Sequence, residues 1–103
     1  MCGILGSALT HEYNNVHESY IRAFDLINNR GPDDKGLDII NAVFGSIYLG
    51  HTRLSILDLS QLGHQPMFSK DQRYSIVFNG EIYNYIELKQ ELRVLGHLFM
   101  TDT

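Results

Sequence analysis

The stretch GLDIINAVFGSIYLGHTRLSILDL, residues 36–59, decides the fold class. It is rich in β-branched and aromatic residues and is interrupted by glycines, a pattern typical of two or three consecutive strands. Strands joined by such short turns pair antiparallel, because a parallel pair needs a long crossover between its strands. The stretch therefore predicts an antiparallel meander, and with it an α+β protein rather than a parallel α/β fold.

Further strands are predicted on both sides of this meander. Small and branched residues over positions 2–9 indicate a first strand. The segment YSIVF, residues 74–78, indicates another, and the short apolar segment HLFM, residues 97–100, a last one. The chain thus alternates strands and helices without regular βαβ units.

Two helices are predicted from the spacing of apolar residues. The first covers residues 16–29, up to the stop signal RGP, and the second begins after Asn84. Each follows an asparagine, Asn15 or Asn84, with a glutamate three residues later, the spacing of a capping box. Gly96 is expected to end the second helix.

Composition limits the possible functions. The 103 residues, 44% of them apolar, suffice for one modest domain. The net charge is −4 and like charges form no run, which argues against binding to nucleic acid or to a membrane surface. Residues 2–9 are too short for a membrane span and lack the basic flank of a signal peptide. We therefore expect a cytoplasmic protein, and a single cysteine suits that reducing compartment.

The single cysteine, Cys2, stands directly behind the initiator methionine. If Met1 is removed, as is usual before a small residue, one residue carries both a thiol and a free α-amine. Near neutral pH the amine is partly in its free-base form and accepts the thiol proton, so nucleophile and base share one residue. The alternative is that Cys2 is a small apolar residue at the edge of a core.

Four blocks of sequence accompany the N-terminal CGI: RGPDDKG (residues 30–36), GHTRLSILDLS (50–60), GHQPM (63–67) and FNGEIYNY (78–85). Their order and spacing resemble those of class II glutamine amidotransferases, most closely the glutaminase domain of asparagine synthetases. The resemblance covers nearly the whole chain. It implies an N-terminal-nucleophile hydrolase, an αββα sandwich with two antiparallel sheets, of which residues 1–103 supply only the first half.

The resemblance also implies a reaction. The N-terminal cysteine attacks the side-chain amide of glutamine, ammonia leaves, and water hydrolyses the glutamyl thioester. Cys2 matches the nucleophile and Arg53 the arginine that holds the α-carboxylate of glutamine, a task that suits the planar guanidinium. Without the motif, Arg53 would be interpreted as part of a solvated strand face. The backbone after it would form one wall of the glutamine pocket, made by Leu54, Ser55, Ile56 and Leu57.

Three further positions match the glutamine site of the family. Asn79 and Gly80 match the oxyanion hole, and Glu81 matches a carboxylate that receives the α-ammonium. Their alternatives are an ordinary Asn-Gly hairpin turn and a solvated turn residue. The family's second ammonium-binding aspartate falls after Thr103, so Asp102, two positions early, is a weaker candidate.

The block RGPDDKG is interpreted as structural, with Gly31 and Pro32 stopping the first helix and Asp33 bonding to the turn backbone. The five histidines show no paired metal-ligand spacing, so we expect no metal. No cofactor is expected within residues 1–103. ATP and magnesium would belong to a synthetase domain, whose SGGxDS-type phosphate loop this sequence lacks.

Three hypotheses for function follow. The first is the glutaminase part of an asparagine-synthetase-like enzyme that supplies ammonia to a synthetase domain in cis, with L-glutamine as substrate. The second is a glutaminase half that serves another acceptor, in an amino-sugar, phosphoribosylamine or β-lactam pathway. The third is a non-catalytic remnant of the fold. In the first two, activity belongs to a full-length parent protein, and residues 1–103 alone are expected to be inactive.

Overall fold

Three antiparallel strands form the main sheet of the computed structural model, which describes residues 1–11, 16–56 and 61–99. Strand β3 (Gly45–Arg53) lies between β1 (Gly3–Thr10) and β2 (Asp34–Ala42), so the spatial order is β1-β3-β2. The predicted antiparallel meander is confirmed for its two strands β2 and β3, which a tight turn joins.

A third strand after β3 does not form over residues 54–56, and residues 57–60 lie outside the described residues. The reason is local. The Leu54 N–H donates to the sulfur of Cys2, and the Ser55 N–H donates to the carboxylate of Asp33. Because these side chains take up the backbone donors, a further ladder cannot use them.

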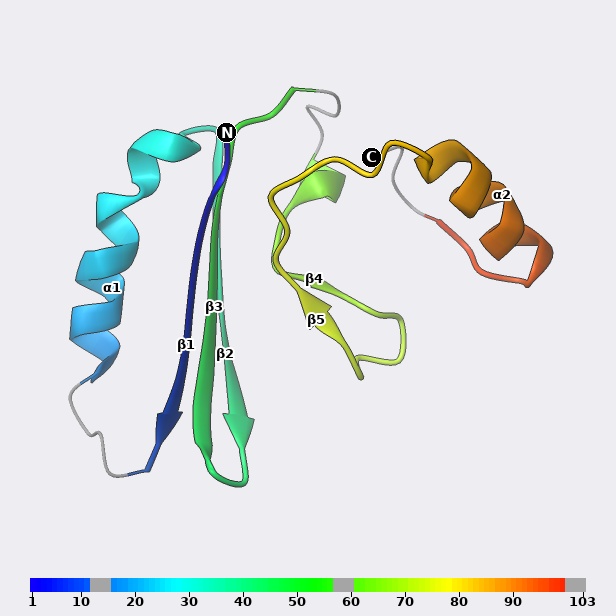
Figure 1. Cartoon of the computed structure of the whole chain (residues 1–103). Coiled ribbons are helices and arrows are strands. Elements are labelled where there is room, and N and C mark those ends of the chain that lie inside the picture. The colour runs from blue at the N-terminus through cyan, green and yellow to red at the C-terminus, as the bar shows by residue number, and fades with distance from the viewer. Residues whose placement is uncertain (12–15, 57–60, 100–103) are drawn as a thin grey trace.

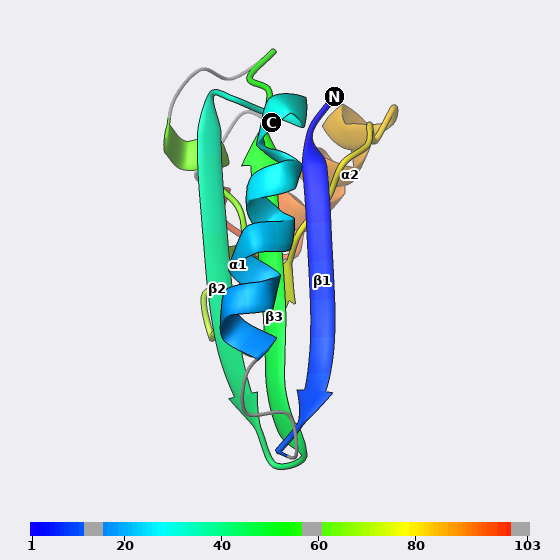
Figure 2. The same ribbon diagram turned by 90° about the vertical axis from the view of Figure 1, so that its left-hand side faces the viewer.

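Helix α1 (Val16–Leu26) covers one face of the main sheet and runs along β3 (Figures 1 and 2). Tyr20 and Phe24 of the helix and Tyr48 of β3 are buried together and form the core. The ring centroids of Tyr20 and Tyr48 lie 4.8 Å apart, and the Tyr20 hydroxyl donates to the Leu5 carbonyl. Burial raises the pKa of Tyr20 to about 12, so the hydroxyl stays protonated and bonded.

The first helix ends earlier than predicted. It stops at Leu26, and a 3₁₀ turn, η1 (Asn28–Arg30), follows in place of its last α-helical residues. The Arg30 N–H donates to the Ile27 carbonyl at 3.0 Å, which tightens this end of the helix. The same carbonyl also accepts the Thr52 hydroxyl at 3.2 Å, which ties the turn to β3. The proposed cap, Asn15, lies outside the described residues.

A short hairpin forms the second sheet. After the 3₁₀ turn η2 (Gln61–Gly63), β4 (Met67–Phe68) pairs antiparallel with β5 (Ser75–Ile76). The strand predicted over residues 74–78 is therefore correct for two residues only. From Val77 to Phe99 the described chain has no strand partner, and Phe78 and the residues before α2 have irregular structure.

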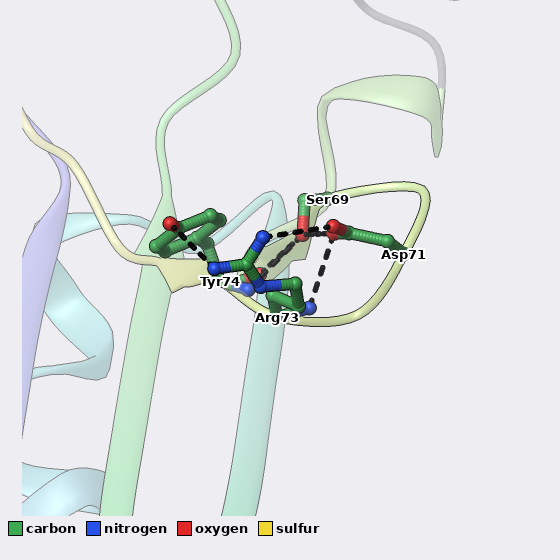
Figure 3. Close-up of polar contacts among 4 residues, drawn as sticks. All are labelled: Ser69, Asp71, Arg73 and Tyr74. Atoms are coloured by element: carbon green, nitrogen blue, oxygen red, sulfur yellow. Dashed lines mark hydrogen bonds and ion pairs between the residues drawn. The ribbon is translucent and has the colours of Figure 1, made fainter.

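Side chains close the loop between β4 and β5 (Figure 3). The Ser69 hydroxyl donates to Asp71 Oδ1 at 2.6 Å and accepts the Tyr74 N–H at 3.0 Å. The Arg73 N–H donates to the same Asp71 oxygen at 3.2 Å, and its guanidinium lies over the Tyr74 ring. The hydrogen bond from Ser69 is the main cause that lowers the pKa of Asp71 below its ordinary value. This network fixes the register of a hairpin that two ladder pairs alone would hold weakly.

Helix α2 (Tyr85–Val94) lies on the far side of the hairpin from the main sheet (Figure 1). The prediction that Gly96 ends it is confirmed: Gly96 has φ 91°, its N–H donates to Arg93 O, and the His97 N–H donates to Leu92 O. The predicted capping box at Asn84 is wrong, because its side chain makes no capping hydrogen bond. The predicted last strand is wrong for residues 97–99, which have no strand partner, and residue 100 lies outside the described residues.

Across the molecule, α1, the main sheet, the β4–β5 hairpin and α2 follow one another (Figure 1). The protein is thus α+β, with antiparallel sheets and two helices, an arrangement compatible with part of an N-terminal-nucleophile hydrolase fold. No residue of α2 is buried. Within the three described ranges, no helix has the length and apolar character needed to cross a membrane.

Candidate functional site

Cys2 lies at the end of the main sheet where β1 begins. Its sulfur accepts a hydrogen bond from the Leu54 N–H at 3.3 Å, and the Leu54 carbonyl lies 3.8 Å from the sulfur. Gly3 pairs with Thr52, so the register extended by one residue places Cys2 opposite Arg53. Directly opposed residues of an antiparallel pair point to the same face. Cys2 and Arg53, 51 positions apart in sequence, therefore share one end and one face of the sheet.

Arg53 is the last residue of β3 and is only 8% exposed. Its guanidinium packs against Gly63, where a Cβ atom would collide with it. Gly63, the first residue of the GHQPM block, thus makes room for the charged group. Its position on the same face as a thiol suits a site for a ligand with a carboxylate, which a guanidinium binds in two parallel hydrogen bonds.

The loop before β2 is hydrogen-bonded to the end of β3 and to the segment that follows it. The Asp33 N–H donates to the Arg53 carbonyl at 3.0 Å, and the Asp33 carboxylate accepts the Ser55 N–H at 2.7 Å. The prediction that Asp33 bonds to the backbone of its own turn is wrong, because its carboxylate bonds to Ser55 in the segment after β3. Leu54 and Ser55 are therefore fixed from two sides, whereas Ile56 is 73% exposed and Leu57 lies outside the described residues.

Two histidines lie beside Arg53. Asp34, which pairs with Arg53 in the register, is bonded to His64 through Nδ1 at 2.6 Å. His51, two residues before Arg53, is 1% exposed, and its Nε2 has no hydrogen-bond partner among the described residues. Burial lowers the pKa of His51, although the nearby Asp34 carboxylate opposes this shift. The His51 ring is therefore neutral at pH 7.

The predicted oxyanion-hole segment follows Phe78. The Phe78 N–H donates to Gln65 Oε1 at 2.6 Å, and Gln65 Nε2 donates to the Phe78 carbonyl at 3.2 Å. A Cβ atom at Gly36 of β2 would collide with the Gln65 carbonyl oxygen, so Gln65 itself lies against the main sheet. The segment is thus anchored close to the end of the sheet that carries Arg53.

The segment after Phe78 is exposed at Asn79, Gly80 and Glu81, and the hydrogen bonds among the described residues do not join these residues to Cys2. An oxyanion hole donates to the substrate rather than to the nucleophile, so the roles of Asn79 and Gly80 stay predictions. The structure brings together Cys2, Arg53 and the backbone after β3. Asp102 lies outside the described residues.

Sequence reasoning assigned no role to Gln65, His64 or Asp34. Gln65 and His64 both belong to the block GHQPM, and membership of this block is the sequence signal that points to them. Their partners are Phe78 and Asp34, 13 and 30 positions away, and no local pattern indicates such pairs.

In the part of the chain that the structure describes, no three or more His, Cys, Asp or Glu side chains are grouped so as to hold a metal ion.

Comparison with known proteins shows the family to which the chain belongs. A family model described as a glutamine amidotransferase domain matches residues 1–103. The chain belongs to this family. No solved structure matches it at a significant level.

Curated relatives share about 40% identity with the chain. A putative glutamine-hydrolyzing asparagine synthetase 2 of Methanocaldococcus jannaschii is 40% identical over 114 residues, which cover 91% of this chain and 21% of the relative. The glutamine-hydrolyzing asparagine synthetase 1 of Bacillus subtilis is 41% identical over 106 residues, covering 100% and 16%. A putative asparagine synthetase of Mycobacterium tuberculosis is 39% identical, covering 99% and 17%. The chain thus spans about a sixth to a fifth of the length of these relatives.

Proposed function

We propose that residues 1–103 are the N-terminal part of a glutaminase domain in an asparagine-synthetase-type enzyme. The enzyme hydrolyses L-glutamine at Cys2 and supplies ammonia to a synthetase domain in cis. The observation that carries the proposal is the common end and face of Cys2 and Arg53, with the Cys2 sulfur bonded to the Leu54 backbone. The relatives are named asparagine synthetases, which supports asparagine synthesis over the other pathways as the use of the ammonia.

The proposed reaction begins with removal of Met1. In the described chain the Cys2 nitrogen is part of the peptide bond to Met1, so the free α-amine forms only after this cleavage. The amine then takes the thiol proton, and the sulfur attacks the side-chain carbonyl carbon of glutamine. The carbon–nitrogen bond breaks, the amine returns the proton to the leaving nitrogen, and ammonia departs. Water next attacks the thioester, releasing glutamate and restoring the thiol.

Each neighbouring group has a task in this scheme. The Leu54 N–H donates to the sulfur and so holds it beside the end of β3. Arg53 holds the α-carboxylate of glutamine, and Glu81 its α-ammonium. Asn79 and Gly80 donate to the oxygen that becomes negative when the sulfur attacks. Since the oxyanion-hole segment is joined to Cys2 by no described hydrogen bond, we propose that glutamine completes the site when it binds.

The ammonia acceptor lies outside this chain. We propose that ATP and magnesium act only in the synthetase domain of the parent and that residues 1–103 need no cofactor. We also propose that the parent works in the cytoplasm. Sequencing the gene beyond codon 103 tests directly which domain follows residues 1–103 in the full-length parent. A different downstream domain would favour another class II amidotransferase, and the absence of one would contradict the proposed enzyme.

The chemistry is tested by trapping the covalent intermediate in the full-length parent. Acid quenching during turnover of glutamine should leave a protein that lacks Met1 and carries a glutamyl group on Cys2, detected by peptide mass spectrometry. Hydroxylamine should intercept the same thioester and release γ-glutamyl hydroxamate. Turnover of glutamine with Met1 retained, or with no adduct on Cys2, would refute the mechanism.

A further inference from the structure

We propose that Gln65 is a positioning residue for the Asn79–Gly80 segment, a role that rests on the function proposed above. Gln65 is partly buried and lies in GHQPM, the block to which the sequence assigned no chemistry. It acts on the site through the backbone of Phe78, the residue directly before Asn79.

One carboxamide satisfies both backbone polar groups of Phe78. The Phe78 N–H donates to Gln65 Oε1 at 2.6 Å, and Gln65 Nε2 donates to the Phe78 carbonyl at 3.2 Å. Two residues of a regular antiparallel ladder exchange the same pair of bonds. Strand β5 ends at Ile76, so Phe78 has no strand neighbour. Gln65 therefore takes the place of the missing partner at the point where the proposed oxyanion hole begins.

Gln65 is itself seated on the sheet that carries Cys2. A Cβ atom at Gly36 would collide with the Gln65 carbonyl oxygen, so the two backbones are in direct contact. Gly36 belongs to β2 and pairs with His51 of β3 in the register. Phe78 is thus connected to the main sheet through Gln65.

The side chain of Phe78 packs against Gly80 and so helps to position it. A Cβ atom at Gly80 would lie 2.7 Å from the Phe78 ring, so the ring packs directly against this glycine. An oxyanion hole works only when its donors are held where negative charge develops. Rotation of the Phe78 backbone would move the Asn79 side chain and the Gly80 N–H together. Gln65 prevents that rotation.

The first test uses Gln65→Met in the full-length parent, because methionine keeps the length of the side chain and removes both hydrogen bonds. We expect kcat for glutamine hydrolysis to fall about tenfold to a hundredfold, since a small displacement of a catalytic group has effects of this size. KM for glutamine and ammonia-dependent synthesis should change little. The matched control is Gln90→Met on the exposed surface of α2, which should leave all three unchanged.

The second test uses Gln65→Glu. Its ionised carboxylate accepts the Phe78 N–H but cannot donate to the Phe78 carbonyl, whereas the protonated acid makes both bonds. The ratio of variant to unsubstituted kcat should therefore rise as pH falls, while the ratio for Gln65→Met stays constant. Acid would not repair a general folding defect, so this profile separates positioning from stability.

Amide hydrogen exchange at Phe78 provides a readout independent of activity. Exchange should be slow in the unsubstituted parent and faster in Gln65→Met. Faster exchange with unchanged kcat would contradict the role of Gln65 and leave the proposed function standing. An equal loss of glutamine-dependent and ammonia-dependent activity in Gln65→Met would have the same meaning. A parent that hydrolyses no glutamine would contradict the proposed function and this inference with it.

Discussion

The backbone N–H of Leu54 donates to the sulfur of Cys2 at 3.3 Å, across 52 positions of sequence. Leu54 is the first residue after β3, and its neighbour Ser55 is held by Asp33 from the loop before β2. The thiol is therefore hydrogen-bonded to a segment that the loop before β2 holds in place. This hydrogen bond holds the sulfur, the proposed nucleophile, beside the end of β3.

Cys2→Ala in the full-length parent is expected to abolish glutamine-dependent synthesis and to leave ammonia-dependent synthesis largely intact, because only the thioester step needs the thiol. Both activities are measured on the same preparation, with ammonia as the alternative nitrogen source. Undiminished use of glutamine by the variant would show that Cys2 is not the nucleophile.

Arg53→Ala and Asn79→Ala should affect different kinetic constants. Loss of the guanidinium should raise KM for glutamine at least about tenfold, because a charge-assisted hydrogen bond to the substrate disappears. Loss of the Asn79 amide should lower kcat about a hundredfold or more with less effect on KM, since that donor acts on the transition state. Initial rates over a range of glutamine concentrations give both constants.

The control for Arg53 is Arg22→Ala, which removes an arginine whose side chain is 80% exposed on α1. It should leave both constants unchanged. Equal effects of Arg53→Ala and Asn79→Ala on KM and kcat would mean that the two roles are assigned incorrectly.

Burial of His51 predicts a pH dependence of stability. Its pKa in the folded protein is lowered from 6.5, mainly by burial, with Asp34, Arg53 and His64 as the charged or titratable neighbours. Below pH 6.5 the unfolded chain binds a proton that the folded protein does not, so this contribution to stability is complete above pH 6.5. It is lost as pH falls toward the folded pKa.

Thermal unfolding of the full-length parent between pH 7.5 and 5.5 measures this effect. His51→Gln should show a smaller loss of the unfolding midpoint over that window than the unsubstituted protein. The exposed His97→Gln should follow the unsubstituted protein. Identical slopes for His51→Gln and His97→Gln would contradict the assignment.

Residues 1–103 expressed alone are expected to aggregate or fold only in part, and to hydrolyse no glutamine. Helix α2 has no buried residue, and several of its apolar side chains are exposed, namely Ile86, Leu88, Leu92 and Val94. Exposed apolar groups in this number favour association. Size-exclusion chromatography, a thermal melt and a glutaminase assay should show recovery when the chain is extended through the rest of the domain. A cooperative melt with glutamine hydrolysis by residues 1–103 would refute this expectation.

Features that depend on residues close together in the chain could be predicted from the amino-acid sequence. Apolar residues at helical spacing located both helices, and Gly96 marked the end of the second because a residue there needs positive φ. The β-rich stretch over residues 36–59 gave the antiparallel class, since its turns are too short for a crossover. The blocks that resemble the amidotransferase family indicated Cys2 and Arg53.

Contacts between residues far apart in the chain could not be predicted in this way, because they depend on the folded arrangement of whole elements. The register between β1 and β3 brings Cys2 opposite Arg53, and the carboxamide of Gln65 replaces a strand partner for Phe78. The folded structure also explains why no third strand forms directly after β3. The side chains of Cys2 and Asp33 accept hydrogen bonds from the backbone N–H groups that such a strand would have used. Such pairings join residues 13 to 52 positions apart, and the spacing of residues within a single element carries no information about them.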